Sequence, residues 1–295
     1  MLAAETRADR AGLGIGLVLS AWLFFAMTDT SVKWLVLAGL PALQLAFMRY
    51  FVSLVLSLAV ALRRGVFFEW STGREMGLVL LRGSLLVVAT LFNFIALNYL
   101  PLSVTSSILN SSPIILTALA VPLLGERVGP FRWAAVVVGF VGVLIVIRPF
   151  GTDFHWAALL MLVNAFALAL FAILTRKLSG SISTQTMQIY MGALGSVILL
   201  PGALLTWQSP VGVLDWALMC GVGLWAWIAH ENVGRAHAFA EASVLMPFSY
   251  AFILYLTVAG LVVFGTVPDT ATLVGAAIIV ASGLVIWWRE QVKRR

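Results

Sequence analysis

Residues 76–98, MGLVLLRGSLLVVATLFNFIALN, form a long apolar stretch that contains one charged side chain, Arg82. A membrane-spanning helix needs roughly 20 such residues, at about 1.5 Å each, to cross a hydrocarbon core of about 30 Å. This stretch is therefore predicted to be a transmembrane helix. Similar runs recur along the chain and predict ten spans, at residues 12–35, 41–62, 76–98, 103–124, 130–148, 154–175, 183–205, 213–237, 243–264 and 270–288.

The span count depends on two less regular places. The break before Ser103 is marked only by residues 98–101, and the inner end of the eighth span is unusually polar. Nine spans are therefore the main alternative to ten. The first apolar run is not followed by a small-residue cleavage site, so we expect it to be a retained helix and not a signal peptide.

The composition is typical of a protein embedded in lipid. Of 295 residues, 62% are hydrophobic and 10% are charged, and the mean hydropathy is +1.05. Soluble domains are about 45–50% apolar and about 25% charged, so lipid must cover part of this surface. We expect an all-α integral membrane fold with no separate soluble domain. The single cysteine, Cys220, excludes an internal disulfide, and no metal or nucleotide-binding motif is present, so no cofactor is expected.

The basic residues predict an orientation. The net charge of +6 could suggest a nucleic-acid partner, but most Lys and Arg side chains fall in the loops and ends of one side. That side holds residues 63–64, 176–177 and 293–295, whereas the other side holds only Lys33 and Arg148. Short cytoplasmic loops are enriched in Lys and Arg. We therefore expect both termini in the cytoplasm, a bacterial inner-membrane location and no nucleic-acid partner.

The two halves of the chain are weakly similar. A shift of 140 residues aligns 77–147 with 217–287 without gaps and pairs Ser103 with Ser243 and Leu116 with Leu256. We predict a first five-helix repeat at 1–150 and a second at 151–295. An odd number of spans in each half inverts the second repeat, which is a common construction of secondary transporters with a central site.

Five segments carry a resemblance to a known family. They are residues 29–33 (DTSVK), 47–50 (FMRY), 81–83 (LRG), 111–114 through 124–127 (SSPI to LGER) and 138–142 (VGFVG). With ten short-looped spans, the chain resembles EamA-type members of the drug/metabolite transporter superfamily. The second half departs from the family pattern at Ile253 and Gly265. The resemblance implies export of amino acids, aromatic ones included, or transport of nucleotide-like metabolites such as S-adenosylmethionine.

Charged side chains inside spans are the first candidates for a substrate site, because burying them in lipid is costly. Asp29 and Lys33 lie four residues apart on the face of the first span that also carries Trp22. They form either a charged wall near the outer mouth or an ion pair at the helix end. Arg49 lies near mid-depth in the second span, where it either meets a substrate carboxylate or ties helices together.

The third and fourth spans carry polar faces. Arg82 and Asn93 share one face of the third span, which suggests a water-lined path with Arg82 near the inner mouth. Asn110 shares a face of the fourth span with Pro113, whose missing amide hydrogen breaks the backbone ladder. A substrate site or hinge and plain helix packing are both consistent with this pattern.

The eighth span holds His230 and Glu231 next to each other, with Trp227 on the face of His230. A proton relay is one interpretation, in which replacing Glu231 with Gln flattens the pH dependence of transport. A polar helix end in the lipid headgroups is the other. Gly234 stands where a zinc-binding His-Glu-x-x-His motif needs its second histidine, so a metal site is not expected.

Asn164, Gln188 and Tyr250 complete the candidate set, as polar residues of three further spans. The first hypothesis is a secondary transporter that moves small organic metabolites, such as amino acids, outward by alternating access. The second is an importer or exchanger of nucleotide-like metabolites. An intramembrane enzyme that uses His230 and Glu231 is the alternative of another class, and we expect no catalytic residue if the chain is a transporter.

Overall fold

The computed structural model describes residues 2–64, 73–124, 129–149, 151, 154–178, 181–240 and 242–294. Nearly all of these residues are helical, and the described part of the chain contains no β-strand. The elements are α1 (Leu2–Leu37), α2 (Ala42–Arg64), α3 (Gly73–Tyr99), α4 (Leu102–Leu109), α5 (Ser112–Leu124), α6 (Pro130–Ile147), α7 (Ala157–Leu178), α8 (Thr184–Leu205), α9 (Val213–Phe239), α10 (Ala242–Leu245), the 3₁₀-helix η1 (Met246–Tyr250), α11 (Ala251–Phe264) and α12 (Thr270–Arg294).

These elements confirm the all-α membrane fold. Within the described ranges, 9 helical segments are long and apolar enough to cross a bilayer, and Trp133–Ile147 of α6 is a shorter apolar segment at the place of the predicted fifth span. The uncertain break before Ser103 exists, because α3 ends at Tyr99 and α4 begins at Leu102. Pro101 precedes α4 in an extended conformation, as its fixed φ and missing amide hydrogen favour.

Two spans are interrupted at equivalent places. The fourth span divides into α4 and α5 at Asn110, and the ninth span passes through the 3₁₀-helix that ends at Tyr250. These two residues are 140 positions apart, which is the shift that aligns the two halves. The backbone and side-chain amides of Asn110 both donate to the carbonyl of Ser106, over 3.0 and 2.8 Å, at the end of α4. Irregular backbone at membrane depth is tolerated where it faces protein or water.

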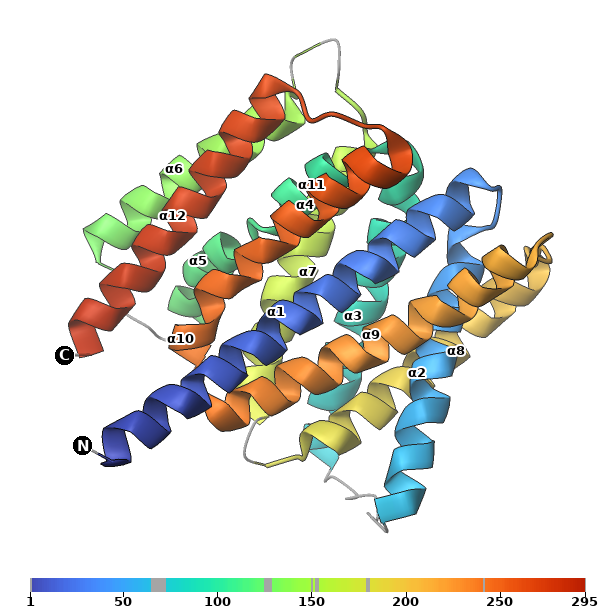
Figure 1. The fold of residues 1–295 in the computed structure, drawn as a ribbon, viewed down its shortest axis with the longest axis horizontal. Coiled ribbons are helices and arrows are strands. Elements are labelled where there is room, and N and C mark those ends of the chain that lie inside the picture. Colours follow the sequence, from blue (N-terminus) through green and yellow to red (C-terminus); the bar gives the residue numbers. More distant parts are fainter. Residues whose placement is uncertain are drawn as a thin grey trace.

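Helix pairs from opposite halves of the chain pack together. Five such pairs are α1 with α9, α3 with α7, α2 with α8, α4 with α11, and α6 with α12. The last pair stands side by side at one edge of the bundle, and both chain termini lie at the same end, at the lower left of Figure 1. The remaining helices surround the middle of the molecule, which is where a site can form.

Helices α8 and α9 pack closely against α2, the second span. A Cβ atom at Gly223 of α9 would lie 2.9 Å from the carbonyl oxygen of Met48 and 3.1 Å from that of Arg49. A Cβ atom at Gly195 of α8 would collide with the ring of Tyr50. Glycine at these two positions lets α9 approach the backbone of α2 and lets α8 pack against the ring of Tyr50. The approach holds Arg49 at a defined depth in the bundle.

Polar contacts join the helices at the end opposite the termini. Gln44 and Gln208 exchange two hydrogen bonds, of 2.8 and 2.9 Å, and Trp34 donates to Asp215 over 3.1 Å. Asp269 accepts from the backbone amide of Thr272 over 2.7 Å and pairs with Arg148. The Thr272 amide, helped by Arg148, lowers the pKa of Asp269. Asp269 therefore stays ionised at neutral pH as the cap of α12.

Candidate functional site: a central cavity

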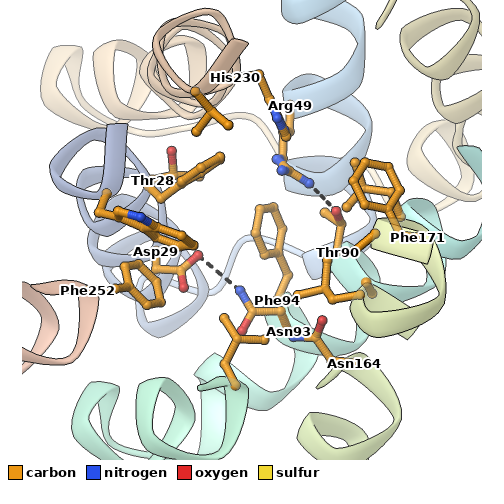
Figure 2. A pocket seen from close by; sticks show the side chains of 18 residues that line it. Thr28, Asp29, Arg49, Thr90, Asn93, Phe94, Asn164, Phe171, His230 and Phe252 are labelled. Atoms are coloured by element: carbon orange, nitrogen blue, oxygen red, sulfur yellow. Dashed lines mark hydrogen bonds between the residues drawn. The ribbon is translucent and has the colours of Figure 1, made fainter. Parts of the chain in front are cut away.

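A cavity of about 380 Å³ lies at the centre of the bundle, a size within the usual range for small-molecule sites. Most of its lining residues come from helices α1, α3, α7 and α9, and α2, α4 and α11 contribute one residue each (Figure 2). The lining residues are Trp22, Phe25, Thr28, Asp29, Arg49, Leu86, Ala89, Thr90, Asn93, Phe94, Leu109, Asn164, Leu168, Phe171, Ala172, His230, Val233 and Phe252. The lining is mainly apolar and aromatic, with a small polar group.

The polar group runs along one face of α3. The amide nitrogen of Asn93 donates to a carboxylate oxygen of Asp29 over 3.0 Å, and Arg49 donates to the hydroxyl of Thr90. Thr90 and Asn93 are neighbours on α3 because they lie three residues apart. We call Asp29, Asn93, Thr90 and Arg49 the polar strip. It connects α1 to α2 across α3, and both bonds are visible in Figure 2.

Aromatic rings form the walls beside the polar strip. The ring of Trp22 lies 5.5 Å from that of Phe25 and 5.4 Å from that of Phe252. His230 meets Phe25 edge-on at 5.0 Å. Phe252 and Phe171 stand on opposite sides of the cavity in Figure 2. Rings on two sides favour a flat, partly apolar ligand between them.

Among the described residues that line the cavity, two buried side-chain polar atoms have no hydrogen-bond partner. They are the side-chain oxygen of Asn93 and Nε2 of His230, and both atoms are buried. Most buried polar atoms in proteins are paired, so an unpaired one needs an explanation such as a ligand or water. Both belong to residues that face the same cavity. They mark positions where a bound molecule would complete the structure.

Six of the residues proposed from the sequence line this cavity: Trp22, Asp29, Arg49, Asn93, Asn164 and His230. The other six lie elsewhere. Arg82 stands behind the wall, where its guanidinium covers Phe171 at 4.1 Å and its Nε donates to Thr175 over 2.6 Å. Asn110 is the C-cap residue of α4, and Gln188 is a buried residue of α8.

The remaining three residues, Trp227, Glu231 and Tyr250, contact other parts of the protein and not the cavity. Trp227 donates to the hydroxyl of Ser57 over 3.1 Å, which links α9 to α2. Glu231 lies 3.6 Å from Arg235 on the same helix, and both side chains are partly exposed. Tyr250 is buried against α12 and does not line the cavity.

Sequence reasoning did not name several lining residues. Thr90 was detectable in principle, since it lies one helical turn from Asn93 on the same face. Phe25, Phe94, Phe171 and Phe252 carried no usable signal, because aromatic residues in an apolar chain resemble those that face lipid. Their role depends on how each helix is rotated about its axis.

Lys33 and Asp29 bind different partners. The ammonium group of Lys33 donates to the carbonyls of Leu97 and Leu100, each at 2.9 Å, where α3 ends. The side chain is buried, and its charge lies 5.8 Å from the centre of the Phe264 ring. The last carbonyls of a helix have no partner within the helix and attract positive charge. Lys33 therefore joins α1 to the C-terminal end of α3.

A first prediction tests whether Tyr250 packs or binds. A Cβ atom at Gly283 would overlap the hydroxyl of Tyr250. We expect Gly283→Ala to lower the free energy of unfolding by about 1–3 kcal/mol through overpacking, and Tyr250→Leu in the same chain to restore most of it. Thermal unfolding in detergent measures both variants. Tyr250→Phe alone should leave transport within about twofold of the unaltered protein, since the hydroxyl has no partner; a larger loss would show that Tyr250 contacts substrate.

Three comparisons with known proteins agree with this architecture. The model of the EamA-like transporter family matches residues 12–148. A riboflavin transporter of Vibrio cholerae is 33% identical over 94% of both chains. An S-adenosylmethionine uptake transporter of Rickettsia bellii is 27% identical over 95% of this chain and 94% of that protein.

A more distant relative and a solved structure extend this picture. A pseudopaline exporter of Pseudomonas aeruginosa is 23% identical over 92% of this chain and 95% of that protein. A solved crystal structure superposes with a TM-score of 0.65 at 20% identity and covers 95% of this chain and 97% of the other. This last likeness establishes the fold alone.

Proposed function

Because the chain belongs to the EamA-like transporter family of the drug/metabolite transporter superfamily, we propose that it carries riboflavin or a closely similar flat, heteroaromatic metabolite. The observation that carries the proposal is the central cavity, where aromatic walls enclose the polar strip. The 33% identity to a riboflavin transporter over 94% of the chain supports the same class of substrate. A flavin has an apolar tricyclic body and a polar edge, which matches this lining.

Transport is proposed to occur by alternating access between two inverted halves, 1–150 and 151–295. In this scheme each span of the first half corresponds to the span five places later, so α1 corresponds to α7 and α3 corresponds to α9. The contact between α1 and α9 then corresponds to the contact between α7 and α3. The pairs α2–α8, α4–α11 and α6–α12 each map onto themselves. The interruptions at Asn110 and Tyr250 obey the same relation. Rocking of such halves about a central site is a known transport mechanism.

Amino-acid export is the second candidate. The cavity contains a side chain of each charge, Asp29 and Arg49, which suits a zwitterion. An aromatic amino acid would also contact the walls formed by Trp22 and Phe252. Both termini are proposed to lie in the cytoplasm of a bacterium, as the distribution of basic residues predicts.

Counterflow in proteoliposomes separates these substrates. The purified protein is reconstituted with unlabelled riboflavin inside the vesicles, and labelled riboflavin is supplied outside. We expect riboflavin to accumulate transiently and to compete better than aromatic amino acids or S-adenosylmethionine. Absence of riboflavin counterflow together with counterflow of an amino acid would overturn the first candidate and support the second. Recovery of a chemically altered substrate would instead support an intramembrane enzyme.

A second prediction concerns proton coupling. Asp29 is the carboxylate that lines the cavity within the described residues, whereas Glu231 pairs with Arg235 at 3.6 Å and is partly exposed. We expect Asp29→Asn to flatten the pH dependence of counterflow, because it removes the ionisable group next to the substrate. Glu231→Gln is the matched control and should keep the profile of the unaltered protein. A flat pH profile in Glu231→Gln together with an unchanged profile in Asp29→Asn would instead assign the proton relay to Glu231, as the sequence alone suggested.

A further inference from the structure

We propose that Asn93 and Arg49 together select substrates with an imide edge, in which a ring N–H is flanked by two carbonyl groups. This inference rests on the proposed function and specifies which part of the substrate the polar strip binds. It assigns substrate specificity to two side chains that also join helices. The argument begins with the orientation of one amide.

Asp29 fixes the orientation of Asn93. An ionised carboxylate only accepts hydrogen bonds, so the amide nitrogen of Asn93 must be the atom that points to Asp29 at 3.0 Å. The amide oxygen is then left as the free atom, and it is buried without a partner. Asn93 is 8% exposed and faces the cavity. A bound molecule must supply a hydrogen-bond donor to satisfy this oxygen.

Arg49 of α2 provides hydrogen-bond donors. It bonds to Thr90, which lies one helical turn from Asn93 on α3. A guanidinium has five N–H donors and no acceptor, and the bond to Thr90 uses one of these donors. Thr90 lies three residues from Asn93 on α3, so the bond to Thr90 holds the guanidinium of Arg49 at the cavity that the Asn93 oxygen also faces. Both side chains line the cavity, with Arg49 in the upper part and Asn93 in the lower part of Figure 2. The strip therefore presents an acceptor and several donors to the same cavity.

The complementary ligand has a donor next to acceptors. An imide has this arrangement, because its N–H lies between two carbonyl oxygens in one plane. The plane of the ring would lie between Phe252 on one side and Phe171 on the other, as Figure 2 places them. Aromatic side chains favour the stacking of a flat heteroaromatic ring. The isoalloxazine ring of riboflavin has one imide, at N3.

The test uses a ligand that lacks only this donor. Riboflavin and its N3-methyl derivative are compared as competitors of labelled riboflavin counterflow by the unaltered protein. We expect N3-methylation to weaken competition by at least about tenfold, since it removes the donor and leaves the Asn93 oxygen unpaired. In Asn93→Leu the two ligands should compete equally, because the side chain that distinguishes them is gone. Asn98→Leu is the matched control, on the same helix but exposed and outside the cavity.

Each outcome decides a different question. Riboflavin counterflow with no preference for the free N3–H would overturn this inference and leave the proposed function intact. Absence of riboflavin counterflow would overturn both. Unchanged discrimination in Asn93→Leu would assign the selectivity to another residue and overturn the role of Asn93. If Asn93→Leu does not fold, the comparison of the two ligands on the unaltered protein still decides whether an imide edge is recognised.

Discussion

With riboflavin as the proposed substrate, we expect Arg49→Met to reduce counterflow by about 10- to 100-fold while the protein remains folded. A hydrogen bond to a charged group contributes about 1.5–3 kcal/mol, and each 1.4 kcal/mol is about tenfold in binding. The variant removes the donors that face the substrate and the bond that holds Thr90. Methionine keeps much of the side-chain length, so the packing between α2 and α9 should survive. The decrease should appear both in counterflow and in flavin binding, measured by fluorescence quenching.

Two further variants separate charge from geometry. Arg49→Lys keeps the charge but loses the planar fork of donors, so we expect an intermediate loss of transport. Arg289→Met is the matched control, because Arg289 lies on α12 over the ring of Phe131, 4.2 Å away, and does not line the cavity. Counterflow by Arg49→Met within about threefold of the unaltered protein would show that Arg49 only ties helices together.

The membrane spans were predictable because hydrophobic length is a local property of the chain. The break before Ser103 was less certain, because Pro101 was the one strong signal there, although proline limits the backbone on both sides of itself. The interruption of the fourth span at Asn110 was suggested by Pro113, but its exact place was not. The matching interruption before Tyr250 was not predicted from local sequence. The structure shows it directly, as the 3₁₀ segment Met246–Tyr250 before α11.

The members of the cavity were harder to predict than the spans. Every candidate was a polar or aromatic residue in an apolar run, and half of these residues line the cavity. Helix α9 shows why. His230 faces the cavity, whereas Trp227, on the same predicted face, bonds to Ser57 and Glu231 pairs with Arg235. Rotation of a helix about its axis is set by tertiary packing, which the sequence of one helix does not contain.

The two hypotheses for Arg49, substrate binding and helix tying, are compatible with its position in the structure. The sequence left open whether it binds a substrate or ties helices together. In the structure it donates to Thr90 across the interface between α2 and α3 and also lines the cavity. A buried guanidinium has enough donors for both tasks. The alternatives were therefore not exclusive, which only the coordinates of its partners reveal.

Lys33→Met will lower the thermal stability of the protein in detergent by several degrees. The substitution leaves the carbonyls of Leu97 and Leu100 without their donor, and an unpaired buried carbonyl costs about 1–3 kcal/mol. Relief from burying a cation offsets part of this loss. A net loss of about 1–3 kcal/mol corresponds to a shift of several degrees for a chain of this size. The apparent unfolding temperature, followed by intrinsic tryptophan fluorescence, measures it.

Comparing Lys33→Arg with Lys33→Met tests whether the positive charge and hydrogen-bond donors of Lys33 stabilise the protein. Arginine also has several donors and a fixed positive charge, so Lys33→Arg should keep more of the stability than Lys33→Met does. Lys177→Met is the matched control, because Lys177 lies in the last turn of α7 with an exposed side chain. Lys33 joins α1, which carries Asp29, to α3, which carries Asn93, so weakening this contact should also weaken the bond between those two residues. Lys33→Met is therefore expected to reduce the preference for the free N3–H of riboflavin as well as the stability. A loss of stability with an unchanged preference for the free N3–H would show that the Lys33 contact and the bond between Asp29 and Asn93 act independently.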